Sequence, residues 1–272
     1  MELLDSLSLG IGTWFLGDHP SHRSQEIEAI RVGLDAGLRI VDTVEMYGDG
    51  RAEVLVGEAI SGRRDDVYLV SKVLPYHADR VGVRKALQAS LERLGTDYLD
   101  LYLLHWPGDV PLVETVEAFE DAVSNGLIRH WGVSNFRVED LDELRAISGD
   151  CATNQVLYNL TRRGPELDLF PQMRRRGMPT MAYSPIEQGR LFAGENGRKL
   201  AAIAKQAGYS PAALALAWVM RDGQTVAIPK AGTTAHIKDN LAALDVELTE
   251  DLLADLDTAF PAPTQPVPLE TL

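Results

Sequence analysis

Four side chains in the first 105 residues have the chemistry of a proton-transfer site, namely those of Asp42, Tyr47, Lys72 and His105. A phenol has an ordinary pKa of about 10 and is a poor acid at neutral pH without help. A lysine ammonium about 4 Å away would favour its ionised form by roughly 4 kcal/mol, whereas burial opposes ionisation. We therefore expect the pKa of Tyr47 to fall by a net one or two units, roughly.

The other two residues complete this arrangement. Burial tends to neutralise a lysine, and the carboxylate of Asp42 would keep the Lys72 ammonium charged. A neutral imidazole at His105 could donate its N–H to a substrate oxygen and orient it. Taken one at a time, the same residues are also typical of a structural ion pair, a loop aromatic and a buried core histidine.

The elements that must position these residues alternate regularly along the chain. Short apolar runs of the β type, such as 38–43, 67–72 and 98–106, are each followed by a helical pattern with apolar spacings of three and four. Eight such β-α units in one chain of this length predict a single-domain (β/α)8 TIM barrel over residues 1–260. The proline-rich tail, 261–272, is expected to be an irregular surface segment at one barrel mouth.

Polar residues stand where most of these apolar runs end. In a (β/α)8 barrel the chemistry is located at the carboxyl ends of the strands. The residues at these predicted strand ends are Asp42 with Tyr47, Lys72, His105, Ser134 with Asn135, Gln155, Tyr183 with Ser184, and Lys230.

Composition excludes several classes of function. The formal net charge is −14 and the isoelectric point is about 4.8, which disfavours nucleic acid and anionic membranes as partners. We expect no membrane span, because no stretch approaches about 18 uninterrupted apolar residues. The single cysteine, Cys151, excludes a disulfide framework and fits a cytoplasmic protein. The histidines show no metal-ligand spacing, so no metal is expected.

Seven sequence strings, in order, resemble the aldo-keto reductases along essentially the whole chain. They are GLRIVDTVEMYG, LVSKV, LGTDYLDLYLLHWP, RHWGVSNF, NQVLYN, MAYSP and AIPKAGT. Within that family the chain is most similar to the compact bacterial members described as methylglyoxal reductases. The resemblance implies an NADPH-dependent carbonyl reductase with Asp42, Tyr47, Lys72 and His105 as its catalytic residues. A monomer is the expected state.

The cofactor cannot be held by a Rossmann fingerprint, because Gly10, Gly12 and Gly17 lack its spacing and the helix that must follow. The stretch AIPKAGTTAHIKDN instead places Lys230 at a strand end before a possible helix N-terminus, where an anion can bind. The resemblance implies the following contacts: Lys230 and Thr233 with a 2′-phosphate, Asn240 with adenine, Ser134, Asn135 and Gln155 with the carboxamide, Tyr183 with the nicotinamide ring, and Ser184 and His236 nearby.

The chain departs from the family pattern at the phosphate site. His236 stands where an arginine is frequent and Ala231 where a serine is frequent. A histidine is a weaker and pH-dependent phosphate ligand, so we expect a modest preference for NADPH, with NADH as a weaker alternative.

The substrate pocket is predicted from two aromatic residues and two short segments. Trp14 and Trp106 follow strand ends and resemble the aromatic pocket wall of the family, although barrel packing would also explain them. The short loop PGDVPL and the short tail predict a shallow pocket for small aldehydes, ketones and dicarbonyls such as methylglyoxal.

Two other functions are compatible with such a barrel. A Schiff-base aldolase would use Lys72 as a nucleophilic amine. A non-catalytic nicotinamide-binding subunit would use the same scaffold without turnover, but it would have no need of an acidified phenol.

Overall fold

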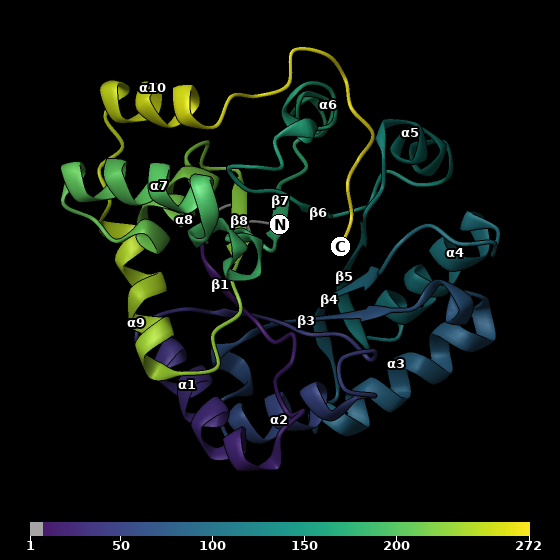
Figure 1. Cartoon of the computed structure of the whole chain (residues 1–272). Coiled ribbons are helices and arrows are strands. Elements are labelled where there is room, and N and C mark those ends of the chain that lie inside the picture. The colour runs from purple at the N-terminus through teal and green to yellow at the C-terminus, as the bar shows by residue number, and fades with distance from the viewer. Residues whose placement is uncertain (1–7) are drawn as a thin grey trace.

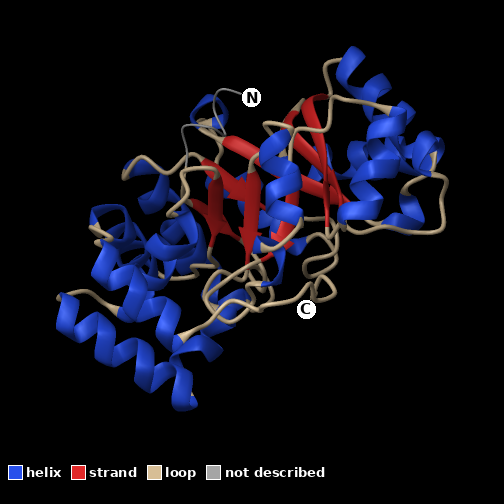
Figure 2. Cartoon of the chain, turned by 90° about the horizontal axis from the view of Figure 1, so that it is seen from above, coloured by secondary structure: helices blue, strands red, loops and turns tan. Residues whose placement is uncertain are grey.

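The computed structural model describes residues 8–272, and it confirms the predicted barrel. Eight parallel strands lie side by side in chain order, and helices surround them (Figures 1 and 2). The strands are β1 (Gly10–Gly12), β2 (Ile40–Asp42), β3 (Tyr68–Val73), β4 (Leu99–Leu104), β5 (Ile128–Ser134), β6 (Asn154–Leu157), β7 (Thr180–Tyr183) and β8 (Thr225–Ile228).

The seam between β1 and β8 closes the barrel through two isolated parallel bridges, Leu9 with Ala227 and Gly12 with Lys230. The amide of Gly12 donates to the carbonyl of Pro229 at 2.9 Å. Strand β1 is short, because the chain turns away after Thr13.

The helices follow the strands as the sequence predicts, with additions late in the chain. Helix α3 ends at Gly95, which adopts a left-handed φ of 64°, the conformation that favours glycine at a helix terminus. Two α-helices lie between β7 and β8, and two follow β8. The helices are α1 (Arg23–Asp35), α2 (Arg51–Ala59), α3 (Arg80–Leu94), α4 (Leu112–Ser124), α5 (Val138–Ile147), α6 (Leu169–Arg175), α7 (Gly194–Ala207), α8 (Pro211–Met220), α9 (Thr234–Leu241) and α10 (Glu250–Ala259).

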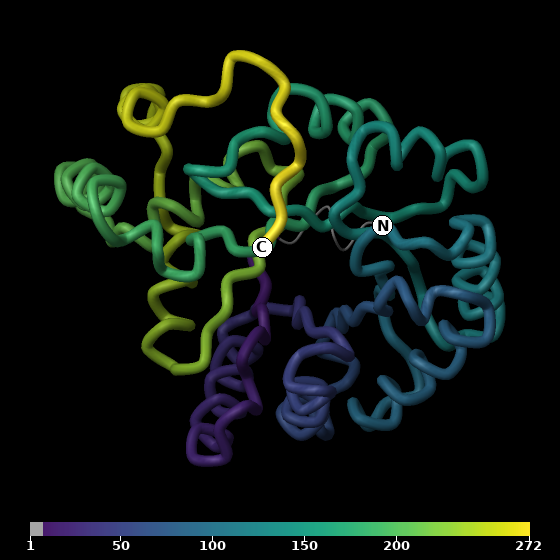
Figure 3. Tube along the Cα trace, turned by 45° about the vertical axis from the view of Figure 1, so that its right-hand side comes forward, coloured from purple at the N-terminus to yellow at the C-terminus, as the bar shows by residue number. Residues whose placement is uncertain are grey.

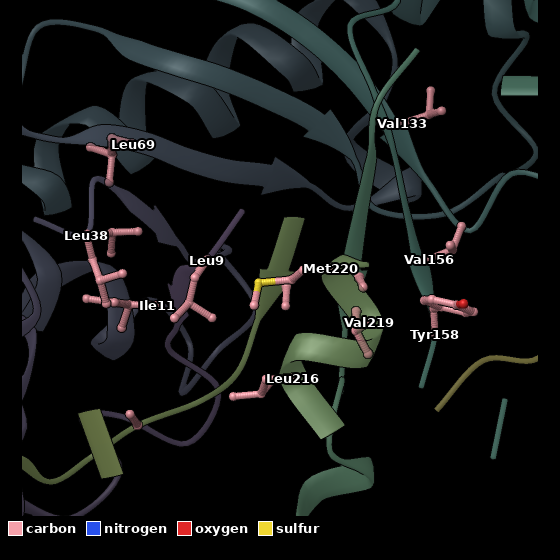
Figure 4. Close-up of a cluster of buried hydrophobic side chains, with 14 of the residues drawn as sticks. Leu9, Ile11, Leu38, Leu69, Val133, Val156, Tyr158, Leu216, Val219 and Met220 are labelled. Carbon is pink, nitrogen blue, oxygen red and sulfur yellow. The ribbon is translucent and has the colours of Figure 1, made fainter. Parts of the chain in front are cut away.

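Two apolar layers result from the alternation of side chains along each strand. In β4, Leu101 and Leu103 belong to the inner cluster within the barrel, whereas Tyr102 and Leu104 belong to the larger cluster between strands and helices. Figure 4 shows part of that outer layer. The same alternation in β3 places Lys72 on the inner face, in line with Val70.

The segment that follows α10 forms no helix or strand over residues 261–272. It runs back across the barrel, and the C-terminus lies near the barrel axis in Figure 3. Among residues 8–272, no helix has the length and apolar character needed to span a membrane.

Candidate active site

A cavity of about 1210 Å³ lies at the carboxyl ends of β1, β2 and β4–β8. It brings together most of the residues that the sequence singled out. The predicted residues that line it are Asp42, Tyr47, His105, Ser134, Asn135, Gln155, Tyr183, Ser184, Lys230, His236, Asn240, Trp14 and Trp106. Lys72 and Thr233 do not line the cavity: Lys72 is buried behind its wall, and Thr233 caps a helix.

Lys72 lies directly behind the cavity lining, with its side chain completely buried. Its Nζ donates to Asp42 Oδ1 at 2.7 Å and to the carbonyl oxygen of Thr43 at 2.8 Å. Burial lowers the pKa of the Lys72 ammonium, and the charge of Asp42 opposes this effect. Asp42 can do so because alternation in β2 places it on the inner face, in line with Ile40.

Tyr47 stands in the loop that joins β2 to α2, and the Lys72 ammonium is 5.8 Å from the centroid of its ring. Its pKa is raised, mainly by burial and further by the charge of Asp42 and by Tyr183. The direction is opposite to the predicted fall. The prediction was wrong because desolvation of the phenol outweighs the field of an ammonium that Asp42 already neutralises.

His105 follows β4, and a hydrogen bond to its backbone carbonyl helps to fix its position. Its carbonyl oxygen accepts a hydrogen bond from Asn135 Nδ2 at 3.1 Å, and Asn135 Oδ1 accepts one from the Tyr183 hydroxyl at 3.0 Å. Burial, assisted by the positive charge of Lys72, lowers the pKa of His105 to about 3. The imidazole is therefore neutral at physiological pH, as the sequence predicted.

Amide and hydroxyl groups from β5 and β6 form the middle of the cavity floor. Ser134 Oγ donates to the carbonyl oxygen of Gln155 at 2.8 Å, and Gln155 Nε2 donates to Asp42 Oδ2 at 2.8 Å. Asn135 and Ser184, directly after β5 and β7, have φ values of 60° and 47°. Left-handed backbone at non-glycine residues is costly and is concentrated at functional sites, where it turns side chains into position.

The far end of the cavity is formed after β8. Lys230 is exposed there, and His236 and Asn240 of α9 share the same lining. The Thr233 hydroxyl caps this helix by accepting a hydrogen bond from the His236 amide at 3.1 Å. Thr233 thus orders the helix N-terminus instead of facing the cavity.

An aromatic and apolar wall borders the cavity near Tyr47, and the sequence showed only part of it. The Trp14 ring stacks on Phe15 with centroids 4.4 Å apart and lies 6.5 Å from the Tyr47 ring. The Trp106 ring lies 4.6 Å from His105. Residues that the sequence did not indicate also line the cavity, among them Phe15, Met46, Phe192, Leu269 and Leu272.

Metal and thiol chemistry find no support in the part of the chain that the structure describes. No three His, Cys, Asp or Glu side chains within residues 8–272 form a group that could hold a metal ion. Cys151 is buried, and burial raises the pKa of its thiol to about 12, so it is an inert core residue.

Comparison with known proteins shows the family to which the chain belongs. Residues 8–260 match the Aldo/keto reductase family. The chain is 49% identical over 263 residues to methylglyoxal reductase YeaE of Escherichia coli (strain K12), which covers 94% of this chain and 92% of that protein.

Solved structures agree with this match. The fold superposes with a TM-score of 0.95 on an aldo/keto reductase from Klebsiella pneumoniae in complex with NADP and acetate, at 47% identity over 97% of this chain and 95% of that one. The thermostable aldo-keto reductase Tm1743, in complex with the inhibitor epalrestat, gives a TM-score of 0.87 at 39% identity, over 92% and 94% of the two chains. This chain is therefore an oxidoreductase of the aldo/keto reductase family.

Proposed function

We propose that this protein reduces small aldehydes and ketones, including dicarbonyls of the methylglyoxal type, with NADPH as the hydride donor. The observation that carries the proposal is the buried Asp42–Lys72 pair beside Tyr47 and a neutral His105 at the edge of the cavity. The relatives described above support the substrate class, since one is a methylglyoxal reductase.

Tyr47 is the proposed proton donor. When bound, NADPH supplies the hydride, and negative charge then develops on the carbonyl oxygen. An alkoxide resembles hydroxide in basicity and is a much stronger base than a phenolate. A phenol whose pKa is raised therefore keeps its proton in the resting protein and releases it only when such a base forms.

Lys72 and Asp42 act behind Tyr47. The ammonium stabilises the phenolate that remains after proton transfer, because opposite charges attract strongly in a buried site. Asp42 holds the ammonium in place at 2.7 Å and opposes its neutralisation by burial. The pair thus acts on the product side of the proton transfer and does not acidify the free phenol.

His105 orients the substrate in this proposal. A neutral imidazole has one N–H that can donate a hydrogen bond to the substrate oxygen. Because it is not protonated to the cation, it does not compete with Tyr47 as the proton donor. The hydrogen bond from Asn135 to the backbone carbonyl of His105 fixes the ring's attachment point at the end of β4.

The residues around the cavity fit a nicotinamide dinucleotide phosphate. Lys230 and the capped N-terminus of α9 provide a cation and free backbone amides for a phosphate. At the other end, the Asn135 and Gln155 amides can recognise a carboxamide, and the half-buried Tyr183 can stack on a planar ring. A related structure from Klebsiella pneumoniae contains NADPH, which supports this choice.

The Schiff-base alternative has no comparable support. The Lys72 amine is completely buried, is bonded to Asp42 and does not line the cavity, so a substrate carbonyl cannot reach it. We also propose that the protein is a cytoplasmic monomer, and a sedimentation measurement would test the monomeric state.

The decisive experiment follows the loss of NADPH absorbance with methylglyoxal for the wild type and for Tyr47→Phe. We expect a loss of turnover of roughly 100- to 10,000-fold, the usual contribution of a general acid. Quenching of tryptophan fluorescence by NADPH should remain within twofold of the wild type, about the precision of the assay. Turnover of Tyr47→Phe at the wild-type rate would show that another group donates the proton.

A further inference from the structure

A second buried carboxylate lies outside the cavity, on the opposite side of β3 from the barrel interior. Glu53 of α2 is 0% exposed, and its Oε1 accepts a hydrogen bond from Ser71 Oγ at 2.6 Å. Its Oε2 accepts one from Arg93 Nε at 2.6 Å, and Arg93 also donates to Ser90 Oγ at 3.1 Å. A buried carboxylate is tolerated only when it is paired in this way.

One partner of Glu53 belongs to the strand that carries Lys72. Ser71 and Lys72 are neighbours in β3, and adjacent side chains of a strand point to opposite faces. Lys72 occupies the inner face with Val70, and Ser71 occupies the outer face with Leu69 and Val73. The hydrogen bond from Ser71 to Glu53 therefore fixes the outer side of the strand at the position where Lys72 points inward.

The other partner of Glu53 contacts the loop that carries Tyr47. This loop, residues 43–50, ends at Gly50, whose φ is 85°. A Cβ atom at Gly50 would lie 2.5 Å from Arg93 Cδ and 2.6 Å from Arg93 Nε, so the arginine packs tightly against the end of the loop. The amide of Ala52 donates to the carbonyl oxygen of Tyr47 at 3.3 Å, which joins the loop to the first turn of α2.

We propose that Glu53 is a positioning residue of the reduction, which fixes the Tyr47 loop relative to the strand that carries Lys72. The proposal rests on the function proposed above, because it assigns a purpose to the relative placement of these two groups. Glu53 does not line the cavity; it reaches the site through Ser71 and Arg93, and its charge also opposes the lowering of the Lys72 pKa by burial. Its effect should therefore appear in the rate of the chemical step, without an equal effect on the binding of cofactor or substrate.

A matched control exists at the opposite end of the barrel. Asp100 is another buried carboxylate, 3% exposed, and it pairs with Arg64 at 2.8 Å. It does not line the cavity and contacts neither the Tyr47 loop nor Lys72. Asp100→Asn should lower the free energy of unfolding about as much as Glu53→Gln does. Unlike Glu53→Gln, it should not lower turnover.

The experiment compares Glu53→Gln, Ser71→Ala and Asp100→Asn in the intact protein, with methylglyoxal and NADPH. For Glu53→Gln we expect kcat to fall roughly 10- to 100-fold, as small misplacements of catalytic groups do. KM and the NADPH dissociation constant should change by less than about threefold, because no group in the cavity is removed. Asp100→Asn should keep kcat within about twofold of the wild type at a comparable loss of stability.

Amide hydrogen exchange gives a readout that does not require turnover. Exchange of residues 43–50 should be faster in Glu53→Gln than in the wild type and unchanged in Asp100→Asn. If Glu53→Gln does not fold, Ser71→Ala decides, with a smaller fall in kcat and faster exchange of the same loop.

Two results would overturn the inference. One is a folded Glu53→Gln protein with wild-type kcat and wild-type exchange in residues 43–50. The other is an equal fall in kcat for Glu53→Gln and Asp100→Asn, which would indicate a purely structural role. A wild-type protein that reduces no carbonyl compound would contradict the proposed function instead, and the exchange measurement would still decide whether Glu53 holds the loop.

Discussion

The barrel has a buried carboxylate paired with a cation at each end, and the two pairs are built differently. Near the amino ends of the strands, Asp100 of β4 accepts from Arg64 Nη2 at 2.8 Å and from the Leu69 amide at 2.9 Å. At the carboxyl ends, Asp42 of β2 accepts from Lys72 Nζ at 2.7 Å and from Gln155 Nε2 at 2.8 Å.

The two cations differ in their surroundings. Arg64 also donates to Thr96 Oγ1 and to the carbonyl oxygens of Val67 and Tyr98, and it stacks on the Tyr98 ring. Two of the three donors of Lys72 have acceptors within residues 8–272, and its neighbour is a phenol at a cavity edge. The pair at Lys72 lies beside a phenol at the edge of the cavity, where it can serve a reaction, whereas neither Arg64 nor Asp100 lines the cavity, and their pair fixes structure.

Of the substitutions proposed as tests, Lys72→Met should have the largest effect, which is a loss of activity. We expect kcat to fall roughly 100- to 10,000-fold, because the phenolate of Tyr47 would lose its counter-charge. Single-turnover reduction with NADPH, normalised to the folded fraction from circular dichroism, measures this effect. Turnover within tenfold of the wild type would make the Asp42–Lys72 pair as structural as the pair at the other end.

Asp100→Asn should show the reverse pattern. It removes the charge that accepts from Arg64, and hydrogen bonds to charged groups are worth about 1.5–3 kcal/mol each. We expect the free energy of unfolding to fall by about 2–3 kcal/mol in urea titrations, with kcat of the folded protein unchanged. Lost turnover at full stability would contradict the division between the two ends.

The sequence predicted the pair at the carboxyl ends of the strands and did not indicate the pair at the amino ends. The positions of Asp42 and Lys72 at the ends of neighbouring predicted strands were sufficient to place them together, and the regular β-α alternation was sufficient to predict the barrel. The depth of Tyr47 could not be read from the sequence, so the direction of its pKa shift was predicted wrongly. The contributions of Phe192 and Leu272 to the cavity depend on how a loop and the tail fold back, for which no local pattern gives a signal.

Lys230→Ala tests the cation at the far end of the cavity. Lys230 is exposed there, whereas Lys72 is buried behind the cavity lining. Loss of one charge-assisted contact should raise the NADPH dissociation constant about tenfold or more, with a much smaller change for NADH. Fluorescence titration with both cofactors measures the difference. Equal losses for the two cofactors would exclude a contact between Lys230 and the 2′-phosphate.

His105 should give a pH dependence of stability that arises at the carboxyl ends of the strands. Its pKa is lowered to about 3, so between that value and about 6.5 the unfolded chain binds a proton that the folded protein does not. Stability should therefore fall as the pH falls through this window. Urea midpoints at pH 7 and pH 4.5 should differ less in His105→Gln than in the wild type, and an identical difference would contradict the lowered pKa.

The seam between β1 and β8 has a consequence for the dynamics of the barrel. Within residues 8–272, two bridges join the edges of the sheet at this seam, and a local opening there would separate the first strand from the last. Lys230 belongs to one of those bridges and also lines the cavity. A dinucleotide held at Lys230 would thus favour the closed seam, so cofactor binding and local opening of the barrel would be linked equilibria.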